Sequence, residues 1–430
     1  MLRTTRAYRA YVQSVDLESR FAPSTFLVNF NFEVGNAMTS NVAMTNNFAR
    51  PTPKRGAALI LAVVLMFVLF SMLAFTIDTG YLSQTRAELT RCSDSAALAG
   101  CWDLYRQLEN NVETDVDSMR TGIVTQASEF ASLNNVCEDG PDLVSSDIKI
   151  GFTNQLRGGA ISSDSSLPFY AVRVKVNKSD QLNGKVPYFF GRIFGNNGRD
   201  MTGESTAVMA RRISGFNAPS GSDTIGILPF ALDETTWNQM LADSASSGHC
   251  AGGTDSYKFN PTTGVVSSGT DGVLEVNLYP QGTGSPGNRG TVDIGGSNNS
   301  TNDIKRQILS GISSADLAAL GRPLQLDATS GTLLLNGDTG ISAAVKDQLS
   351  QIVGQKRVIP IFRSVSGNGN NANYTIVKFV GVRVMNVRLT GSVSTKQVIV
   401  QPAPVIVKYA QRSTSAGVSD FVLTPVLLAE

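Results

Sequence analysis

Residues Gly56–Ile77 read GAALILAVVLMFVLFSMLAFTI, and this stretch decides the architecture. It holds no charged residue, and only Ser71 and Thr76 are polar. As a helix rising about 1.5 Å per residue it would be about 33 Å long, which matches a bilayer core. A helix in a soluble core is shorter or carries a polar face. We therefore expect a transmembrane helix, and because no second run of comparable length follows, a single pass.

The charges on either side of this stretch predict its orientation. Three basic residues precede it, Arg50, Lys54 and Arg55, whereas Asp78 follows it and the next basic residue is Arg86. Since Lys and Arg are retained on the cytoplasmic side, we expect the N-terminus inside and about 350 residues exported. A cleaved signal peptide is the competing interpretation. It is disfavoured because the apolar run is too long and no clean A-x-A site follows.

Residues 1–55 are predicted to be a flexible cytoplasmic tail. They hold scattered arginines, several Ser and Thr, and the polar run Asn41–Asn47. A start assigned too early, with Met38 or Met44 as the true first residue, is the alternative.

The composition narrows the classes of function. The chain has 430 residues, 36 Lys and Arg against 35 Asp and Glu, and a formal net charge of +1. A balance so even argues against a protein built to coat nucleic acid. The single histidine, His249, excludes most multi-histidine metal sites. Because no convergent acid, base and nucleophile can be nominated, the sequence predicts no enzymatic activity, no cofactor and no metal.

The stretch after the membrane helix, Asp78–Arg106, contains no proline. Apolar residues recur in it every three or four positions, which predicts a helix with one packing face. From Ser93 to Gly100 nearly every face is small, so another helix can approach closely. Residues 56–77 and 78–112 are thus expected to form one long rod. A simple stalk and a docking surface for a partner helix are both consistent with it, and the expected packing residues are Leu82, Leu89, Asp94, Ala96, Ala97, Ala99 and Gly100.

The run RGAALILAVVLMFVLFSMLAFTIDTGYLSQTRAELTRCSDSAALAG resembles the N-terminal segment of the TadE/TadG-like proteins of Tad (Flp) pilus assembly. The family pattern is an Arg-Gly pair, an apolar helix, an acidic exit and a small-residue helix. It is matched by Arg55-Gly56, Asp78, Gly80, Leu89 and Asp94–Gly100. The resemblance covers about a tenth of the chain. It implies a bacterial inner-membrane protein with a periplasmic domain in the cell envelope, and partners among pilus-apparatus or pilin-like proteins.

At one position this sequence differs from the pilins that prepilin peptidase cleaves. Pilins cut by prepilin peptidase usually carry Glu five residues after the cleavage glycine, and counting from Gly56 that position is Leu61. The glutamate would neutralise the amine of the next subunit inside an apolar filament. Its absence argues against processing and against a role as major pilin, and so implies an anchored assembly or accessory factor.

The rest of the chain predicts an α+β fold in two mixed regions. Residues 113–213 are expected to form a small α+β unit. It holds a helix around 114–133, an alternating strand at Tyr170–Asn177, aromatic residues in Val186–Phe194 that cap the sheet, and a further strand at Thr206–Ile213. Ser214–Asp223 is expected to be a linker.

Residues 214–430 are expected to be a strand-rich α+β domain. Asp233 is the expected N-cap of a short helix, and a helix at Ser342–Val353 is expected to stop at Gly354. Long strands are predicted at 374–389, 397–409 and 421–428. The first of these changes phase, which predicts a bulge near Met385–Asn386.

Several tempting sites are disfavoured by their context. Gly282, Gly284 and Gly287 spell G-x-G-x-x-G, but two prolines intrude and no helix follows, as a dinucleotide loop requires. The adjacent His249 and Cys250 do not converge on one atom. Residues 243–246 come closest to a D-x-S-x-S metal-adhesion loop and fail at the third position.

The four cysteines suit an oxidising exterior. Cys92 and Cys101 lie about 13 Å apart on a continuous helix, which is too far for a disulfide. A Cys101–Cys137 bond that closes a helix hairpin is the favoured pairing. A Cys137–Cys250 bond and free thiols are the alternatives.

These observations predict a single-pass, membrane-anchored structural or assembly factor that resembles TadG-like proteins and displays a large exported domain. Its partners would be the membrane and other Tad components, with no nucleic acid and no small-molecule substrate. The alternative is a membrane-tethered binding module or adhesin unconnected with pili, using the Gly/Asn-rich loops 281–303 and 366–373.

Overall fold

A computed structural model describes residues 55–110, 119–156, 159–245, 254–279, 289–295, 300–367, 369–413 and 419–429. By its internal contacts the chain divides into two units, Met1–Val64 and Leu65–Glu430. Every element after the first helix belongs to the second unit. The fold is mixed α+β, as the sequence predicts, with a small barrel that the sequence did not indicate.

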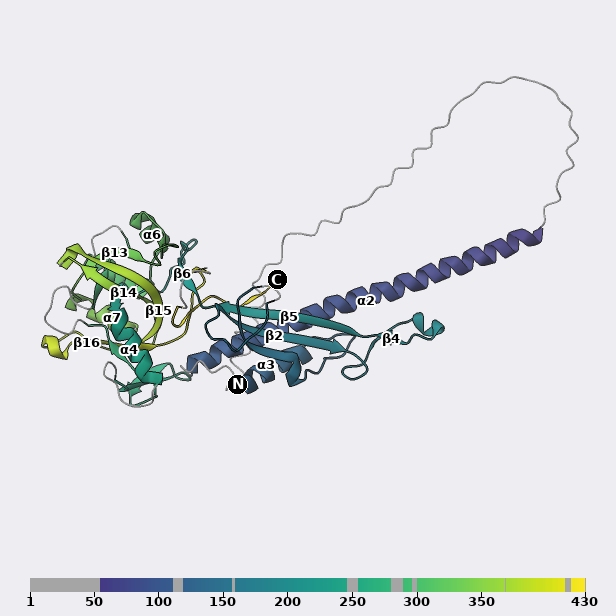
Figure 1. The fold of residues 1–430 in the computed structure, drawn as a ribbon, viewed down its shortest axis with the longest axis horizontal. Coiled ribbons are helices and arrows are strands. Elements are labelled where there is room, and N and C mark those ends of the chain that lie inside the picture. The colour runs from purple at the N-terminus through teal and green to yellow at the C-terminus, as the bar shows by residue number, and fades with distance from the viewer. Residues whose placement is uncertain are drawn as a thin grey trace, which may run out of the picture. The chain divides into compact units, whose positions relative to one another are not determined.

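The first helix, α2, runs unbroken over the 56 residues Arg55–Asn110 (Figure 1). The prediction of one continuous rod is confirmed. Its hydroxyl groups do not interrupt it, because Ser71, Thr76 and Thr79 each donate to the carbonyl four residues earlier. These polar groups are thereby satisfied within the helix, as an apolar environment requires.

Beside the second part of α2 lie helix α3 (Arg120–Ser132) and a four-stranded antiparallel sheet (Figure 1). The strand order is β1 (Ile148–Thr153), β2 (Phe169–Lys178), β5 (Met201–Ala210) and β20 (Leu427–Leu428). The alternation predicted for β2 is confirmed, since Val172, Val174 and Val176 are fully buried. Because β20 comes from the far end of the chain, the last residues complete the first sheet.

Between β2 and β5 the chain forms a small hairpin of β3 (Val186–Pro187) and β4 (Gly198–Arg199), with a 3-10 turn η2 (Gly191–Phe194) near its end. The aromatic residues here were expected to cap the sheet. That expectation is wrong for Phe189 and Phe194, which are 57% and 78% exposed. The reason is that β3 and β4 pair only with each other, so their two-residue strands provide no face that could bury a ring.

The second region contains a closed ring of five strands. The ring follows β15–β13–β11–β7–β14 and returns to β15, and the β7–β14 pair is its parallel contact. Strands β16 and β10 extend the sheet beyond β15. The bounds are β7 Phe230–Asp233, β10 Val276–Asn277, β11 Arg289–Val292, β13 Leu333–Asp338, β14 Lys356–Ser366, β15 Ala372–Arg388 and β16 Gln397–Pro402.

The helices of this region are short. They are α4 Glu234–Ala245, α5 Thr301–Ser310, α6 Ser314–Leu320, η3 Ala343–Val345 and α7 Lys346–Gln351. Two of the end signals are confirmed. The Asp233 carboxylate accepts from the Thr236 N–H at 2.8 Å and caps α4, and Gly354 adopts φ +85° after the last helix. The bulge in β15 is confirmed between Val384 and Asn386.

Three smaller sheets and several turns complete the description. Ser214–Phe216 belong to β6, so the expected linker Ser214–Asp223 does not begin at residue 214. The strands expected at 397–409 and 421–428 are broken into shorter pieces. The bounds are β6 Ile213–Phe216, β12 Leu324–Gln325 and β18 Ala410–Arg412 in one sheet; β17 Val405–Ile406 with β19 Val422–Leu423; β8 Tyr257–Asn260 with β9 Val265–Ser268; and the turns η1 Ser145–Asp147, η4 Gly369–Asn371 and η5 Val393–Thr395.

The buried apolar side chains form three clusters. One joins the second part of α2 to α3 and the first sheet. Another packs α4, α5 and α7 against the strands of the ring. The third contains Phe169 and Val208 of the first sheet together with Tyr374 and Phe379 of β15. The two regions therefore share a core.

Candidate functional site

The first part of α2, residues 58–77, is here called the apolar half. Every large apolar side chain from Leu59 to Ile77 is exposed, with relative exposures of 40% to 73%. Soluble monomers rarely leave a continuous apolar surface of this size uncovered. The helix is long and apolar enough to cross a membrane. Of the predicted orientation residues, Arg50 and Lys54 lie outside the described residues, and Arg55 is the first residue of α2.

The second part of α2, residues 89–108, is here called the buried half. It contains most of the residues expected to pack: Leu89, Ala96 and Ala97 are 0% exposed and Ala99 is 5% exposed. Gly100 is also buried, whereas Leu82 and Asp94 are half-buried. The expected packing is therefore present. The neighbours on this face are the chain's own α3 and sheet. The sequence left a simple stalk and a docking surface for a partner helix both open, and neither anticipated that the chain itself covers this face.

Two glycines set how closely these elements approach. A Cβ built on Gly100 would lie 3.1 Å from Val172 Cγ1 and 3.3 Å from Ile123 Cγ2, so α2 meets both β2 and α3 at this point. A Cβ on Gly203 of β5 would lie 2.7 Å from the Leu89 carbonyl oxygen. Real Cβ atoms do not come that close to backbone, so the crossing of β5 over α2 requires glycine at 203.

Polar contacts fix the register of the buried half. Asp94 accepts a hydrogen bond from the Ser205 hydroxyl of β5, and the Ser93 and Ser205 hydroxyl oxygens lie 2.7 Å apart. Further along α2, Gln107 donates to Asp103 at 2.6 Å and to the Met119 carbonyl at 3.0 Å, which joins the end of α2 to the start of α3. Asp94 thus has a structural partner within the chain.

Asp78, the first residue after the apolar half, holds the hairpin turn beyond β3. Its carboxylate accepts from the backbone N–H groups of Phe189 at 2.7 Å, Phe190 at 3.2 Å and Gly191 at 2.8 Å. Desolvation raises the pKa of Asp78, but these three donors outweigh it and bring the pKa below its ordinary value. The sequence predicted Asp78 as the acidic exit of the apolar run, and it gave no signal for the contact with the hairpin turn.

The cysteines contradict the favoured disulfide. Cys92, Cys101 and Cys137 are free thiols. Cys137 Sγ lies 3.4 Å from Thr85 Oγ1, and Thr85 precedes Cys101 by 16 positions, or about 24 Å along a helix. A disulfide needs Cα atoms within about 7 Å of each other. Cys137 therefore packs at the wrong level of α2 to reach Cys101, and Cys250 lies outside the described residues.

A half-buried lysine lies where the end of α2 meets the barrel. Lys356 Nζ of β14 donates to the Tyr105 hydroxyl at 3.0 Å, and Tyr105 donates to the Pro404 carbonyl at 3.4 Å. Burial, reinforced by the nearby positive charge of Arg383, lowers the pKa of Lys356 to about 7. Burial also raises the pKa of Tyr105 to about 12. These groups make the contact sensitive to pH.

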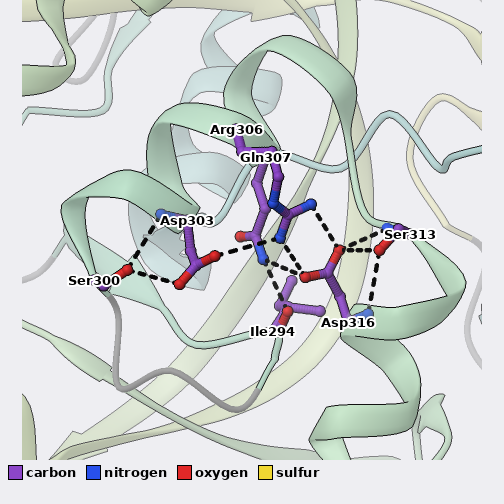
Figure 2. A network of polar contacts seen from close by, with 7 residues as sticks. All are labelled: Ile294, Ser300, Asp303, Arg306, Gln307, Ser313 and Asp316. Carbon is purple, nitrogen blue, oxygen red and sulfur yellow. Dashed lines mark hydrogen bonds and ion pairs between the residues drawn. The ribbon is translucent and has the colours of Figure 1, made fainter.

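The polar network between α5 and α6 is structural (Figure 2). Arg306 binds the Asp316 carboxylate through both terminal nitrogens, one of them at 3.0 Å, and Ser313 donates to the same carboxylate from its N–H and its hydroxyl. Desolvation raises the pKa of Asp316, but these donors lower it below the ordinary value. Gln307 donates to the Ile294 carbonyl at 3.0 Å. Asp316 is thus enclosed by partners and caps α6.

The remaining sequence candidates gain no support. His249, Cys250 and the G-x-G-x-x-G glycines lie outside the described residues. Asp243 accepts from Gln239 at 2.9 Å within α4. Within the ranges that the structure describes, no three His, Cys, Asp or Glu residues gather in a group that could hold a metal ion.

The comparison with protein families identifies α2. Residues 56–103 match the family Tad, described as putative Flp pilus-assembly TadE/G-like. The resemblance read from the sequence is confirmed, and the matched segment covers the apolar half and most of the buried half. No curated protein and no solved structure matches the chain. The family match suggests a role in pilus assembly, and the apolar helix is compatible with a membrane anchor.

Proposed function

We propose that this chain is a single-pass, membrane-anchored structural or assembly factor of a Tad-type pilus apparatus, with the residues after the apolar half exported. The observation that carries the proposal is the division of the Tad-like segment. Its first half presents uncovered apolar side chains, and its second half is built into the core of a folded region. A helix divided in this way joins a lipid anchor to a folded body.

The buried half also favours an accessory role over that of a filament subunit. Pilin-like packing along a filament needs a helix face that neighbouring subunits can reach. In the buried half that face is covered by α3 and by the sheet. Together with Leu61 in place of the pilin glutamate, this supports a protein that helps to build or anchor the pilus.

The proposed orientation rests on the flanking charges, with Arg50, Lys54 and Arg55 inside and Asp78 outside. The anchor would lie in the bacterial inner membrane and the folded region in the periplasm. The role is structural, because the polar clusters described above are engaged in packing and capping. The adhesin alternative used loops 281–303 and 366–373. Residues 281–288, 296–299 and 368 lie outside the described residues, and residues 289–292 of the first loop form strand β11 of the ring.

Topology and partnership are tested separately. Fusion at Glu430 to a reporter that is active only outside the cytoplasm should give activity, and fusion to one that is active only inside should give none. The reverse result would refute the orientation. Purification of the full chain from detergent-solubilised membranes of its native host should recover pilus-apparatus or pilin-like proteins, and their consistent absence would refute the pilus role.

A complementation experiment gives a matched control. Deletion of the gene should abolish the pili, and the full chain should restore them. The chain without residues 1–77, exported by an unrelated cleavable signal, should fold but not restore them, because its anchor is missing. Restoration by this soluble form would show that the anchor is dispensable.

A further inference from the structure

The turn beyond β3, residues 188–194, is here called the aromatic tip. Three of its apolar side chains are largely uncovered: Phe189 is 57% exposed, Ile193 is 76% exposed and Phe194 is 78% exposed. The other large exposed apolar side chains described after α2 are scattered singly along the chain. Three within six residues form a concentration that a soluble surface does not favour.

The aromatic tip is an ordered turn. Tyr188 N–H donates to the Asn197 carbonyl at 3.2 Å, and Asn196 N–H donates to the Gly191 carbonyl at 3.1 Å. Gly195 ends η2 in the left-handed region at φ +81°. The apolar side chains are therefore held outward by a defined backbone, which lowers the entropy that a contact would cost.

The position of the aromatic tip is fixed by the point where the apolar half ends. The uncharged run stops at Ile77, and Asp78 binds three consecutive N–H groups of the tip at 2.7 to 3.2 Å. One turn later, the Tyr81 ring meets the Phe189 ring edge to face, with centroids 5.0 Å apart. Because Asp78 is the first charged residue after the apolar run, it marks the boundary between lipid and water in a spanning helix.

We propose that the aromatic tip is a second membrane contact, in which Phe189, Ile193 and Phe194 enter the headgroup layer of the same bilayer that α2 spans. The inference rests on the proposed anchoring function. Aromatic and aliphatic side chains on a rigid turn suit this layer. The exposed Arg192 between them suits lipid phosphates, since arginine extends its charge toward the headgroups while its stem stays in apolar surroundings.

This contact gives the anchor a defined tilt and rotation. A lone helix can rotate about its own axis within the bilayer, and its orientation is set by anchors at the interface. A turn fastened to one side of α2 by Asp78 adds such an anchor. The folded region would then face the membrane with one particular side.

The test uses the full chain in nanodiscs of phosphatidylethanolamine and phosphatidylglycerol, with one copy per disc and Cys137 and Cys250 replaced by serine. A polarity-sensitive dye on Ile193→Cys should emit at shorter wavelength than in water and be quenched by lipids spin-labelled near the headgroup. The matched control is Val265→Cys in β9, where the native side chain is also exposed, at 57% against 76% for Ile193. Its dye should stay aqueous and unquenched. Equal behaviour at the two positions would overturn the inference.

A dye on Leu69→Cys separates this inference from the anchor itself. Quenching by labels deep in the bilayer at 69, with an aqueous signal at 193, would leave the anchor standing and refute the membrane contact of the tip. An aqueous signal at both positions would refute both. Asp78→Ala should reduce the quenching at 193, because the three N–H donors lose their acceptor, and unchanged quenching would refute the tether. If the dye at residue 193 left its aqueous state only in discs that hold two copies, the tip would contact a second chain and not the membrane, and the proposal would be overturned.

Discussion

The apolar half of α2 and its buried half share one unbroken helix, and they differ in what surrounds their side chains. In the apolar half large side chains point outward, and nothing in the described part of the chain covers them. In the buried half the side chains on one face, among them Leu89, Ala96 and Ala97, are covered by α3 and the first sheet. The comparison shows that helix length alone does not mark a membrane segment. The coverage of the apolar side chains separates the half that needs lipid from the half that packs against protein.

The strongest way to break this comparison is to separate the buried half from its sheet. Gly203→Val should lower the free energy of unfolding by about 4 kcal/mol, because a side chain there meets the Leu89 backbone, and valine's preference for strands cannot compensate. The measurement is chemical denaturation of the full chain in detergent, followed by circular dichroism.

The matched control is Gly80→Ala in α2, where a Cβ meets nothing within 4 Å. It should raise the stability of the helix by up to about 1 kcal/mol. If Gly203→Val lowered the free energy of unfolding no more than Gly80→Ala does, β5 would not cross α2 as closely as described.

Truncating one leucine in each half compares the two environments directly. Leu89→Ala should cost about 3 kcal/mol, since the side chain is 0% exposed and its removal leaves a cavity. Leu69→Ala, where the side chain is 58% exposed, should leave the unfolding of the folded region unchanged. If the same denaturation measurement gave both variants a similar loss of stability, the two halves would not differ in environment as described.

The end of the buried half carries a pH-dependent contact through Lys356. Its pKa falls from 10.5 to about 7 on folding, so between these values the unfolded chain binds more protons and stability rises with pH. Below about pH 7 Lys356 is charged in both states, and the full cost of burying its charge lowers the stability of the folded chain. Lys356→Met should flatten the dependence between about pH 7 and 9.5, a change on the order of 1 kcal/mol after allowance for solvent screening.

The measurement is the denaturation midpoint at several pH values, kept below the range in which Tyr105 ionises in the unfolded chain. Lys378→Met provides the matched control, because Lys378 is paired with Asp420 and lies outside this contact. An unchanged slope in Lys356→Met would show that the amine is not desolvated there.

The smallest expected effect concerns the thiols. Because Cys92, Cys101 and Cys137 are free, a reductant should not change the unfolding midpoint. In native protein a thiol reagent should react with the half-buried Cys137 faster than with Cys101, whose burial keeps its pKa well above the ordinary value. A midpoint that falls on reduction would show that the chain contains a disulfide and would contradict the free thiols.

Local patterns predicted much of the fold. The uncharged run of α2, the alternation in β2, the Asp233 cap and the bulge in β15 each depend on residues close in sequence, whose spacing fixes the geometry. The closure of the barrel depends on the parallel pair of Ile361 with Leu232, and no local pattern encodes a contact between strands so far apart. A ring of strands was therefore beyond the reach of periodicity.

Most of the residues predicted to pack on α2 are buried, but the sequence did not indicate that α3 and the first sheet cover them. Small residues such as Ala96 and Gly100 indicate that another structural element approaches α2 closely. They do not indicate whether that element belongs to the same chain. The aromatic tip was misread for a different reason. Phe189 and Phe194 were expected to cap the sheet because aromatic side chains are usually buried, whereas the neighbouring Gly191 and Gly195 are residues typical of an exposed turn.

The pairing of β20 with β5 has a consequence for the order of folding. Leu427 and Leu428 supply the last strand of the sheet that begins near residue 148. That sheet cannot be completed until ribosomal synthesis has passed residue 428, so the edge of β5 that receives β20 stays unpaired while the barrel is being made. Open edges invite aggregation and non-local pairing slows folding. During synthesis the backbone of β5 that pairs with β20 is therefore open to such wrong pairing until residues 427–428 have been made.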